Sequence, residues 1–117
     1  MDSVEIKSVD AVRVRRCMDE YAAELLAKNL AVKEIVVFGS FAADTYAPGS
    51  DLDVFIILDS AQKRPRDRIP DFLPSEFPVP MDVFPFTRAE IAELDSSPLL
   101  AAVRESNWRY KRLRHIG

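Results

Sequence analysis

Three aspartates, Asp51, Asp53 and Asp82, are the side chains in this sequence best suited to chemistry. Asp51 and Asp53 are separated by one leucine, so an extended strand would present both carboxylates on the same face. Asp82 follows in a separate apolar stretch, between Met81 and Val83. Carboxylate oxygens are the hard ligands that Mg²⁺ prefers, and two such ions can stabilise both the attacking and the leaving oxygen of phosphoryl transfer. The three acids therefore indicate a metal-assisted site for phosphate chemistry.

A glycine–serine pair, Gly39-Ser40, directly follows an apolar run and is separated from Asp51 by ten residues. Glycine allows the backbone to approach a phosphate closely, and N–H groups at the start of a helix favour an anion. The serine hydroxyl adds another hydrogen-bond donor. The pair therefore predicts a phosphate-binding turn close to the acids.

Each of these signals has a simpler interpretation when it is taken alone. Asp51 and Asp53 could cap a turn after Gly49, and Asp82 could be an edge-strand acid that faces water. Gly39-Ser40 could be an ordinary turn that caps a helix. The combination and its spacing favour a functional site over three separate coincidences.

Strands must carry these residues if the site is to form. Residues 35–38 are an apolar, β-branched run that predicts a buried strand, and residues 51–58 predict a second strand whose one face begins with the two acids. The connection at residues 40–50 is short for a parallel crossover, so we expect an antiparallel arrangement that brings Gly39-Ser40 beside the start of the second strand, at residues 51–53. Residues 79–86 predict a third strand, placed at an edge because it contains prolines.

Helices are expected around this sheet. Apolar residues recur at steps of three and four over residues 8–29, which predicts an amphipathic helix with Ser8 as N-cap. A short helix is expected over residues 87–94, and another from residue 97, where a proline suits the first helical position.

Two stretches are expected to lie outside the regular elements. Residues 59–78 are interpreted as a long loop with a helical turn around residues 67–73. Its arginines are expected to be solvated, and the alternative is that they bind phosphate; they are Arg64, Arg66 and Arg68. The tail at residues 107–115 is aromatic and basic, and we expect its rings to pack on the domain.

Composition limits the class of protein. The chain has 117 residues, which fits a single domain over residues 1–117. A net charge of −3 argues against a dedicated nucleic-acid binder, and the single cysteine, Cys17, excludes an internal disulfide. The sequence has no signal-peptide pattern and no apolar run long enough to cross a bilayer, so a cytoplasmic location is expected.

At this point the sequence resembles the DNA-polymerase-β-like nucleotidyltransferase superfamily, and within it the minimal nucleotidyltransferases. The resemblance rests on Gly39-Ser40, on Asp51 and Asp53, and on Asp82, each in its apolar context. It implies an α+β fold with a small mixed β-sheet and helices packed on one face. It also implies that the three acids are catalytic and bind two Mg²⁺ ions, while Gly39 and Ser40 bind a nucleoside triphosphate.

The resemblance further implies a reaction and a partner. The expected reaction moves a nucleoside monophosphate, AMP from ATP, to a hydroxyl of a protein or small molecule. Minimal members resemble the antitoxins of toxin–antitoxin pairs, so the expected partner is a helical HEPN-type protein or a second copy of the chain. One position departs from the family pattern: Phe41 stands where an arginine often follows the glycine–serine pair. A catalytically weak protein that binds a partner is therefore the alternative, and a nucleic-acid adaptor is a more distant one.

Overall fold

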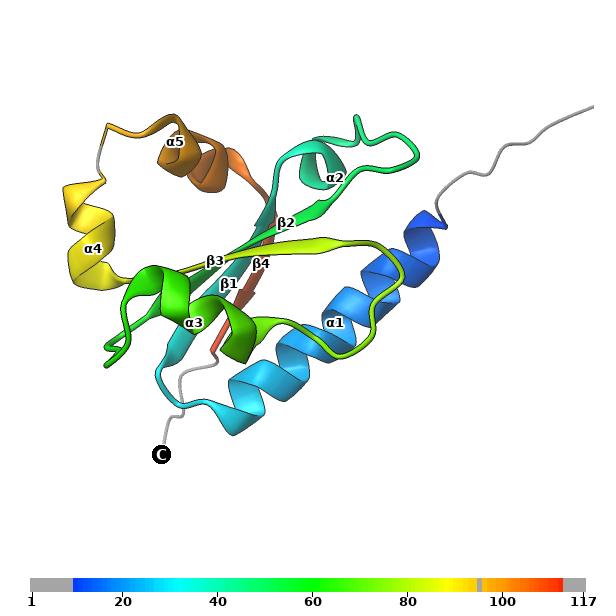
Figure 1. Ribbon diagram of the computed structural model, residues 1–117. Coiled ribbons are helices and arrows are strands. Elements are labelled where there is room, and N and C mark those ends of the chain that lie inside the picture. Colours follow the sequence, from blue (N-terminus) through cyan, green and yellow to red (C-terminus); the bar gives the residue numbers. More distant parts are fainter. Residues whose placement is uncertain (1–9, 95, 113–117) are drawn as a thin grey trace, which may run out of the picture.

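A four-stranded sheet with the order β3-β2-β1-β4 organises the chain. The computed structural model describes residues 10–94 and 96–112. Figure 1 shows the strands at the centre with the helices around them. The elements follow one another as α1 (Ala11–Lys28), β1 (Val32–Phe38), α2 (Ser40–Ala43), β2 (Leu52–Leu58), α3 (Pro65–Phe72), β3 (Met81–Thr87), α4 (Arg88–Glu93), α5 (Pro98–Glu105) and β4 (Trp108–Lys111).

The strand β1 lies inside the sheet and pairs antiparallel with both β2 and β4. Residues Ile35–Phe38 are buried, which explains why the sequence is apolar without alternation there. The antiparallel β1–β2 pair was expected from the short connection. The β2–β3 pair is parallel, and β3 lies at an edge as its prolines require. The sheet is therefore mixed, and the predicted α+β class is confirmed.

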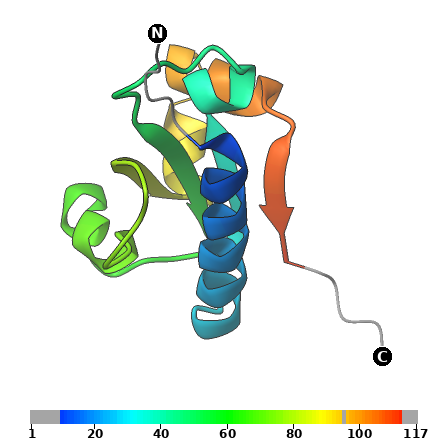
Figure 2. The same ribbon diagram turned by 90° about the vertical axis from the view of Figure 1, so that its right-hand side faces the viewer.

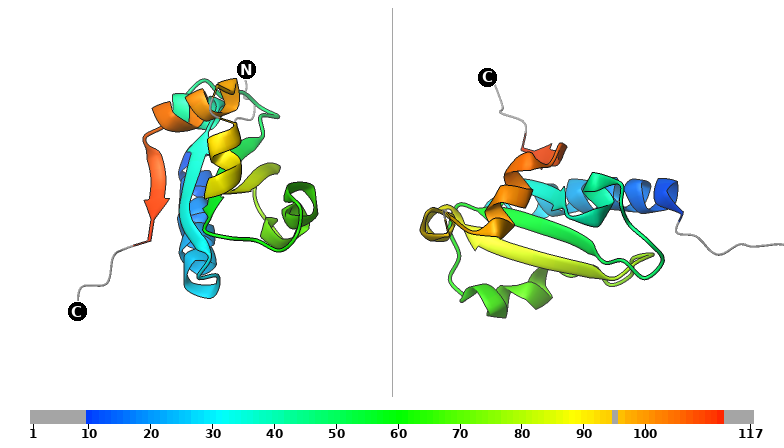
Figure 3. Two further views of the ribbon diagram at one scale, coloured as in Figure 1. Left: turned by 90° about the vertical axis from the view of Figure 1, so that its left-hand side faces the viewer. Right: turned by 90° about the horizontal axis from the view of Figure 1, so that it is seen from above.

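Helices cover both faces of the sheet, which corrects the expectation of one covered face. On one face, α1 packs Val14, Met18 and Ala22 into the core cluster that contains Val54 and Ile56. On the other face, Leu100 and Val103 of α5 pack against Val36, Phe38 and Phe55. The left panel of Figure 3 shows α4 in front of the strands and α1 behind them. The reason is that β1 and β2 are apolar on both sides, so each side needs a cover.

The N-cap of helix α1 lies two residues later than the sequence suggested. Asp10 is its N-cap, and the Asp10 carboxylate accepts a hydrogen bond of 3.1 Å from the backbone N–H of Arg13. The Ser8 cap predicted from the sequence lies outside the described residues. At the other end, Lys28 pairs with Glu24 one turn earlier at 2.8 Å, and the helix stops at Asn29. Figure 2 shows α1 along one face of the sheet, with β4 at the edge.

The segment read as a loop contains α3, and Arg68 in this helix is buried rather than solvated. Its guanidinium forms two hydrogen bonds to the Glu90 carboxylate, of 2.7 and 2.8 Å, and one of 3.0 Å to the carbonyl of Pro85. Glu90 also closes a capping box with Thr87 at the start of α4. Arg68 therefore fastens α3 to the far end of β3, because its guanidinium bonds both to Pro85 in β3 and to Glu90 in α4.

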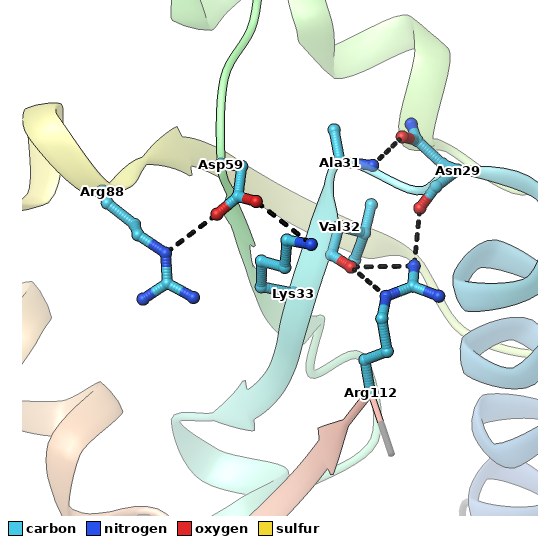
Figure 4. A network of polar contacts seen from close by, with 7 residues as sticks. All are labelled: Asn29, Ala31, Val32, Lys33, Asp59, Arg88 and Arg112. Atoms are coloured by element: carbon cyan, nitrogen blue, oxygen red, sulfur yellow. Dashed lines mark hydrogen bonds and ion pairs between the residues drawn. The ribbon is translucent and has the colours of Figure 1, made fainter. Parts of the chain in front are cut away.

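A second polar network fastens the same end of the sheet (Figure 4). Asp59, which follows β2, pairs with Lys33 at 3.0 Å and with Arg88 at 3.0 Å. Arg112 donates to the carbonyls of Asn29 and Val32, at 2.9 Å each. These cations lie where β2 ends, whereas the acids Asp51 and Asp53 lie where it begins. None of the helices in the described ranges combines the length and hydropathy needed to cross a bilayer.

Candidate active site

The three predicted acids lie at one end of the strands, where β2 and β3 begin. Asp53 is the second residue of β2 and Asp82 the second residue of β3, and the parallel register places these two residues directly opposite each other. Asp51 immediately precedes β2 and is exposed. Adjacent strands lie about 4.8 Å apart, so the side chains at paired positions are neighbours on one face. The register therefore brings together two acids that are far apart in the sequence.

The charges of the three acids affect one another. Burial raises the pKa of Asp53 above its usual range, and the negative charges of Asp82 and Asp51 raise it further. The pKa of Asp82 is also raised, by burial first, then by the charge of Asp51 and by a hydrogen bond between these two carboxyl groups. Like charges at close range disfavour the ionised form, so the cluster stores electrostatic repulsion that a cation would relieve.

Gly39 lies against Asp53 because the antiparallel register pairs Asp53 with Phe38, the residue before the glycine. A Cβ atom at position 39 would overlap Oδ2 of Asp53. The backbone at Gly39 has φ +78° and ψ −152°, a combination that is essentially restricted to glycine. Glycine is therefore required here both by the backbone and by the carboxylate beside it.

Ser40 is the first residue of the short helix α2, and Gly39 is its N-cap. The Ser40 carbonyl accepts a hydrogen bond of 2.9 Å from the Thr45 N–H, and the Gly39 carbonyl accepts one of 3.0 Å from the Ala43 N–H. These bonds fix the turn that follows β1. The structure thus brings Gly39 and Ser40 to the same edge as the three acids.

Phenylalanine rings lie behind the acids on the same face of the sheet. Phe55 stands two residues after Asp53, and Phe84 stands two residues after Asp82. The ring of Phe38 lies 6.4 Å from that of Phe55 and 5.4 Å from that of Phe84, measured between centroids. This aromatic cluster joins the three strands directly below the carboxylates. It fixes their spacing and lowers the local polarity, which is consistent with the raised pKa of Asp53.

Phe41 is a core residue in this structure. It is 7% exposed, and its ring stacks on that of Tyr46 with a centroid distance of 4.6 Å and an interplanar angle of 4°. The side chain at this position therefore anchors α2 to the fold. It points into the core, where an arginine could not be accommodated without an ion-pair partner.

The donor set at this edge fits a divalent metal ion of the Mg²⁺ type. All three side chains offer carboxylate oxygens, and their mutual repulsion would be relieved by a dication. Within residues 10–94 and 96–112, no group of three or more His, Cys, Asp or Glu side chains forms a preformed metal site. Mg²⁺ in proteins is usually held by one or two carboxylates together with phosphate oxygens and water, so the acids would supply only part of its ligands.

Comparison with known proteins places this arrangement in a family. The sequence model of the nucleotidyltransferase domain matches residues 18–111, a range that contains Gly39, Ser40 and the three acids. The chain belongs to the nucleotidyltransferase domain family. None of the curated proteins matches this nucleotidyltransferase domain significantly.

The fold has a counterpart among solved structures. A crystal structure of a nucleotidyltransferase candidate from Sulfolobus solfataricus superposes with a TM-score of 0.57 at 16% sequence identity. The superposition covers 86% of this nucleotidyltransferase domain and 80% of the other chain. At this identity the match shows a shared fold. The family match supports nucleotidyl transfer as the general activity.

Sequence reasoning missed several features around the site. It did not anticipate the strand β4, which carries Trp108, nor the burial of Arg68 against Glu90. The repeated spacing of an acid and a phenylalanine two residues later, in both Asp53–Phe55 and Asp82–Phe84, was a readable signal for the aromatic support. No pattern in the sequence could have placed helix α1 and the glycine turn on the same groove, because the two segments are distant in the sequence.

Proposed function

We propose that this nucleotidyltransferase domain transfers a nucleoside monophosphate, AMP from ATP, to a hydroxyl group, and that the reaction depends on Mg²⁺. The observation that supports it best is the position of Asp53 directly opposite Asp82, with Gly39 against Asp53 and with Asp51 close enough for its charge to raise the pKa of both. Three carboxylates and a glycine turn thus lie together where β2 and β3 begin. We place the protein in the cytoplasm.

In the proposed reaction the acceptor hydroxyl attacks the α-phosphorus of the nucleotide. The new O–P bond forms as the bond to the bridging oxygen breaks, and pyrophosphate leaves with the electron pair. Asp51, Asp53 and Asp82 would hold Mg²⁺, which supplies Lewis-acid stabilisation of the charge on the phosphate oxygens. Asp82 lies on the edge strand and is exposed, so it is also placed to accept the proton of an incoming hydroxyl. Gly39 and Ser40 would position the triphosphate.

The acceptor in this proposal is a hydroxyl on a protein partner or a small molecule. A HEPN-type helical protein is the proposed partner, in an antitoxin role, and self-association is the other arrangement that we consider. This part of the proposal rests on the resemblance to minimal nucleotidyltransferases.

The test begins with Mg·ATP binding. We expect Mg·ATP to raise the melting temperature of the wild-type protein and to leave that of Asp51→Asn/Asp53→Asn unchanged. Incubation of co-purifying proteins with Mg²⁺ and each nucleotide should then produce a mass gain of one nucleoside monophosphate on the acceptor. If wild-type protein shows no shift with any nucleoside triphosphate and Mg²⁺, the proposal is wrong.

A second candidate is a partner-binding protein on this fold that does not transfer nucleotide. It is favoured by the core position of Phe41 and by the charge of the region, because residues 34–62 contain no lysine, arginine or histidine. In that case Asp51→Asn/Asp53→Asn binds the partner as the wild-type protein does, and labelled nucleotide appears on no protein.

A further inference from the structure

The acid-bearing part of the fold has no positive charge of its own. Residues 34–62, which include α2 and β2, contain no lysine, arginine or histidine, and neither do residues 69–87, which include β3. Yet the proposed substrate is a polyanion that must approach three carboxylates. Charge-assisted hydrogen bonds from arginine are a strong way to hold such a group. A cation, if the site has one, must therefore come from another element.

A groove beside the glycine turn is lined by such an element, the helix α1. It has a volume of about 930 Å³ and lies between the first turns of α1, the helix α2, and the segment that joins α5 to β4. Gly39 lines this groove, whereas none of the three acids does, so the glycine turn separates the groove from the carboxylates. Figure 2 shows the start of α1, α2 and the beginning of β4 close together. Its size is within the range of small-molecule sites.

The two basic side chains that line the groove are Arg15 and Arg16, both from α1. The Arg15 guanidinium lies over the ring of Trp108, 4.3 Å from its centroid, and 3.7 Å from the Asp19 carboxylate. Trp108 is held in turn, since its indole N–H donates a hydrogen bond of 2.8 Å to the hydroxyl of Tyr110. Arg15 is therefore part of the wall of the groove.

Arg16 differs from Arg15 in its ion pairing. Both side chains are exposed, but an ion pair with a carboxylate of the described residues is found for Arg15 and not for Arg16. We propose that Arg16 is the phosphate-binding cation of the site, and that the polyphosphate of the nucleotide extends past Gly39 into the groove that Arg16 lines. This inference rests on the proposed function, because it assigns a residue to the binding of the same substrate.

Other cations of the fold are engaged elsewhere. Arg68 is fully used by Glu90 and two backbone carbonyls, and Arg64 pairs with Asp67 at 3.3 Å. Lys33 and Arg88 share Asp59 at the opposite end of β2 (Figure 4). Among the cations with described partners, these lie away from Gly39. The location of Arg16 in the groove is thus what distinguishes it.

The experiment measures binding rather than turnover. Isothermal titration calorimetry with Mg·ATP compares wild type with Arg16→Ala, Arg16→Lys and the control Arg13→Ala. Arg13 is exposed on the same helix and does not line the groove, so the control removes the same charge. We expect Arg16→Ala to weaken binding about tenfold or more, as for loss of a charge-assisted hydrogen bond. Arg16→Lys recovers part of the affinity, and Arg13→Ala stays within about twofold of wild type.

Tripolyphosphate, with Mg²⁺ and without a nucleoside, tests which part of the ligand Arg16 contacts. We expect Arg16→Ala to lose affinity for tripolyphosphate by the same factor as for ATP, with an unchanged melting temperature. Equal affinity of Arg16→Ala and wild type for Mg·ATP would overturn the inference and leave the proposed function intact. A loss confined to ATP, with tripolyphosphate unaffected, would also overturn it. Absence of binding to wild type would reject the proposed function itself.

Discussion

The Asp53 carboxylate occupies the space that a side chain at position 39 would need. This relationship couples the glycine turn after β1 to the acid on β2, since neither can move without the other. The two residues are also joined through the pairing of Phe38 with Asp53 in the sheet. The glycine turn and Asp53 thus form one structural unit.

Substitution Gly39→Ala should therefore damage both fold and site. We expect a loss of stability of about 2 kcal/mol or more from the backbone conformation alone, and an added displacement of Asp53. Mg·ATP should no longer raise the melting temperature.

The matched control for this change is Gly49→Ala. Gly49 also has a positive φ, of +90°, but a Cβ atom there meets nothing within 4 Å. We expect it to cost about 1 kcal/mol and to retain the Mg·ATP response. Similar nucleotide responses in the two variants would contradict the role of the Gly39–Asp53 contact. Thermal unfolding with and without Mg·ATP measures both effects.

Neutralising Asp53 or Asp82 should stabilise the protein in the absence of metal. The pKa of each is raised in the folded state, so the charged forms cost folding free energy at neutral pH. We expect Asp53→Asn and Asp82→Asn to raise the melting temperature by a few degrees at pH 7 without metal, and to abolish the response to Mg²⁺. Glu76→Gln, an exposed loop acid, serves as the charge control and should change neither. A lower melting temperature in both aspartate variants would show that the repulsion is not significant.

The response to Mg²⁺ should depend on pH. Metal ligands must be deprotonated, and the raised pKa values of Asp53 and Asp82 mean that protons compete with the metal at a higher pH than at an ordinary aspartate. We expect the Mg²⁺-induced rise in melting temperature to be complete at neutral pH and to disappear on acidification above pH 3.8, the usual aspartate pKa. Titration with MgCl₂ alone at a series of pH values measures this, and a response that persists below pH 3.8 would contradict it.

The ion pair between Arg68 and Glu90 should dominate acid stability. Arg68 first, together with the hydrogen bonds of the Thr87 cap, lowers the pKa of Glu90 to about 2 from 4.5. A lowered pKa contributes stability that is complete above pH 4.5 and lost as pH falls towards 2. We expect Glu90→Gln to destabilise the protein by about 2 kcal/mol at pH 7 and to flatten the pH dependence in that window.

Glu24→Gln is the comparison for Glu90→Gln. Glu24 forms an exposed pair with Lys28 on α1, and its loss should cost less than about 1 kcal/mol. Chemical denaturation of the three proteins between pH 2 and 7 distinguishes a buried anchor from a surface pair. Equal losses in the two variants would show that the burial of Arg68 does not strengthen its ion pair.

The strands that carry the site could be predicted because their signals are local. β1 and β2 are apolar runs joined by a short connection, and both the run and the connection length are visible in the sequence. The pairing of β2 with β3 could not be predicted in the same way, since α3 and a long connection separate them. Asp82 was recognised by its type and context, but its place opposite Asp53 is a property of the sheet alone.

The burial of Arg68 could not be predicted from the composition of its segment. A segment with several arginines and prolines is typical of a solvated loop, and Arg64 fits this expectation. Arg68 differs because Glu90, in a distant helix, offers both carboxylate oxygens to it. Such a partner is invisible until the chain is folded. The strand β4 was missed for a related reason, because its short aromatic and basic sequence pairs only with β1.

The parallel pairing of β2 and β3 has a consequence for how this architecture tolerates changes in length. The crossover that contains α3 leaves β2 at the end opposite the acids and returns to the start of β3, beside Asp82. Extra residues inserted ahead of α3 are therefore far from the acids and would cost little, since each doubling of a flexible connection adds about 0.6 kcal/mol. A single residue inserted within β3 ahead of Asp82 would instead turn this acid to the opposite face. Insertions between β2 and α3 should therefore be tolerated, whereas an insertion within β3 would remove Asp82 from the candidate site.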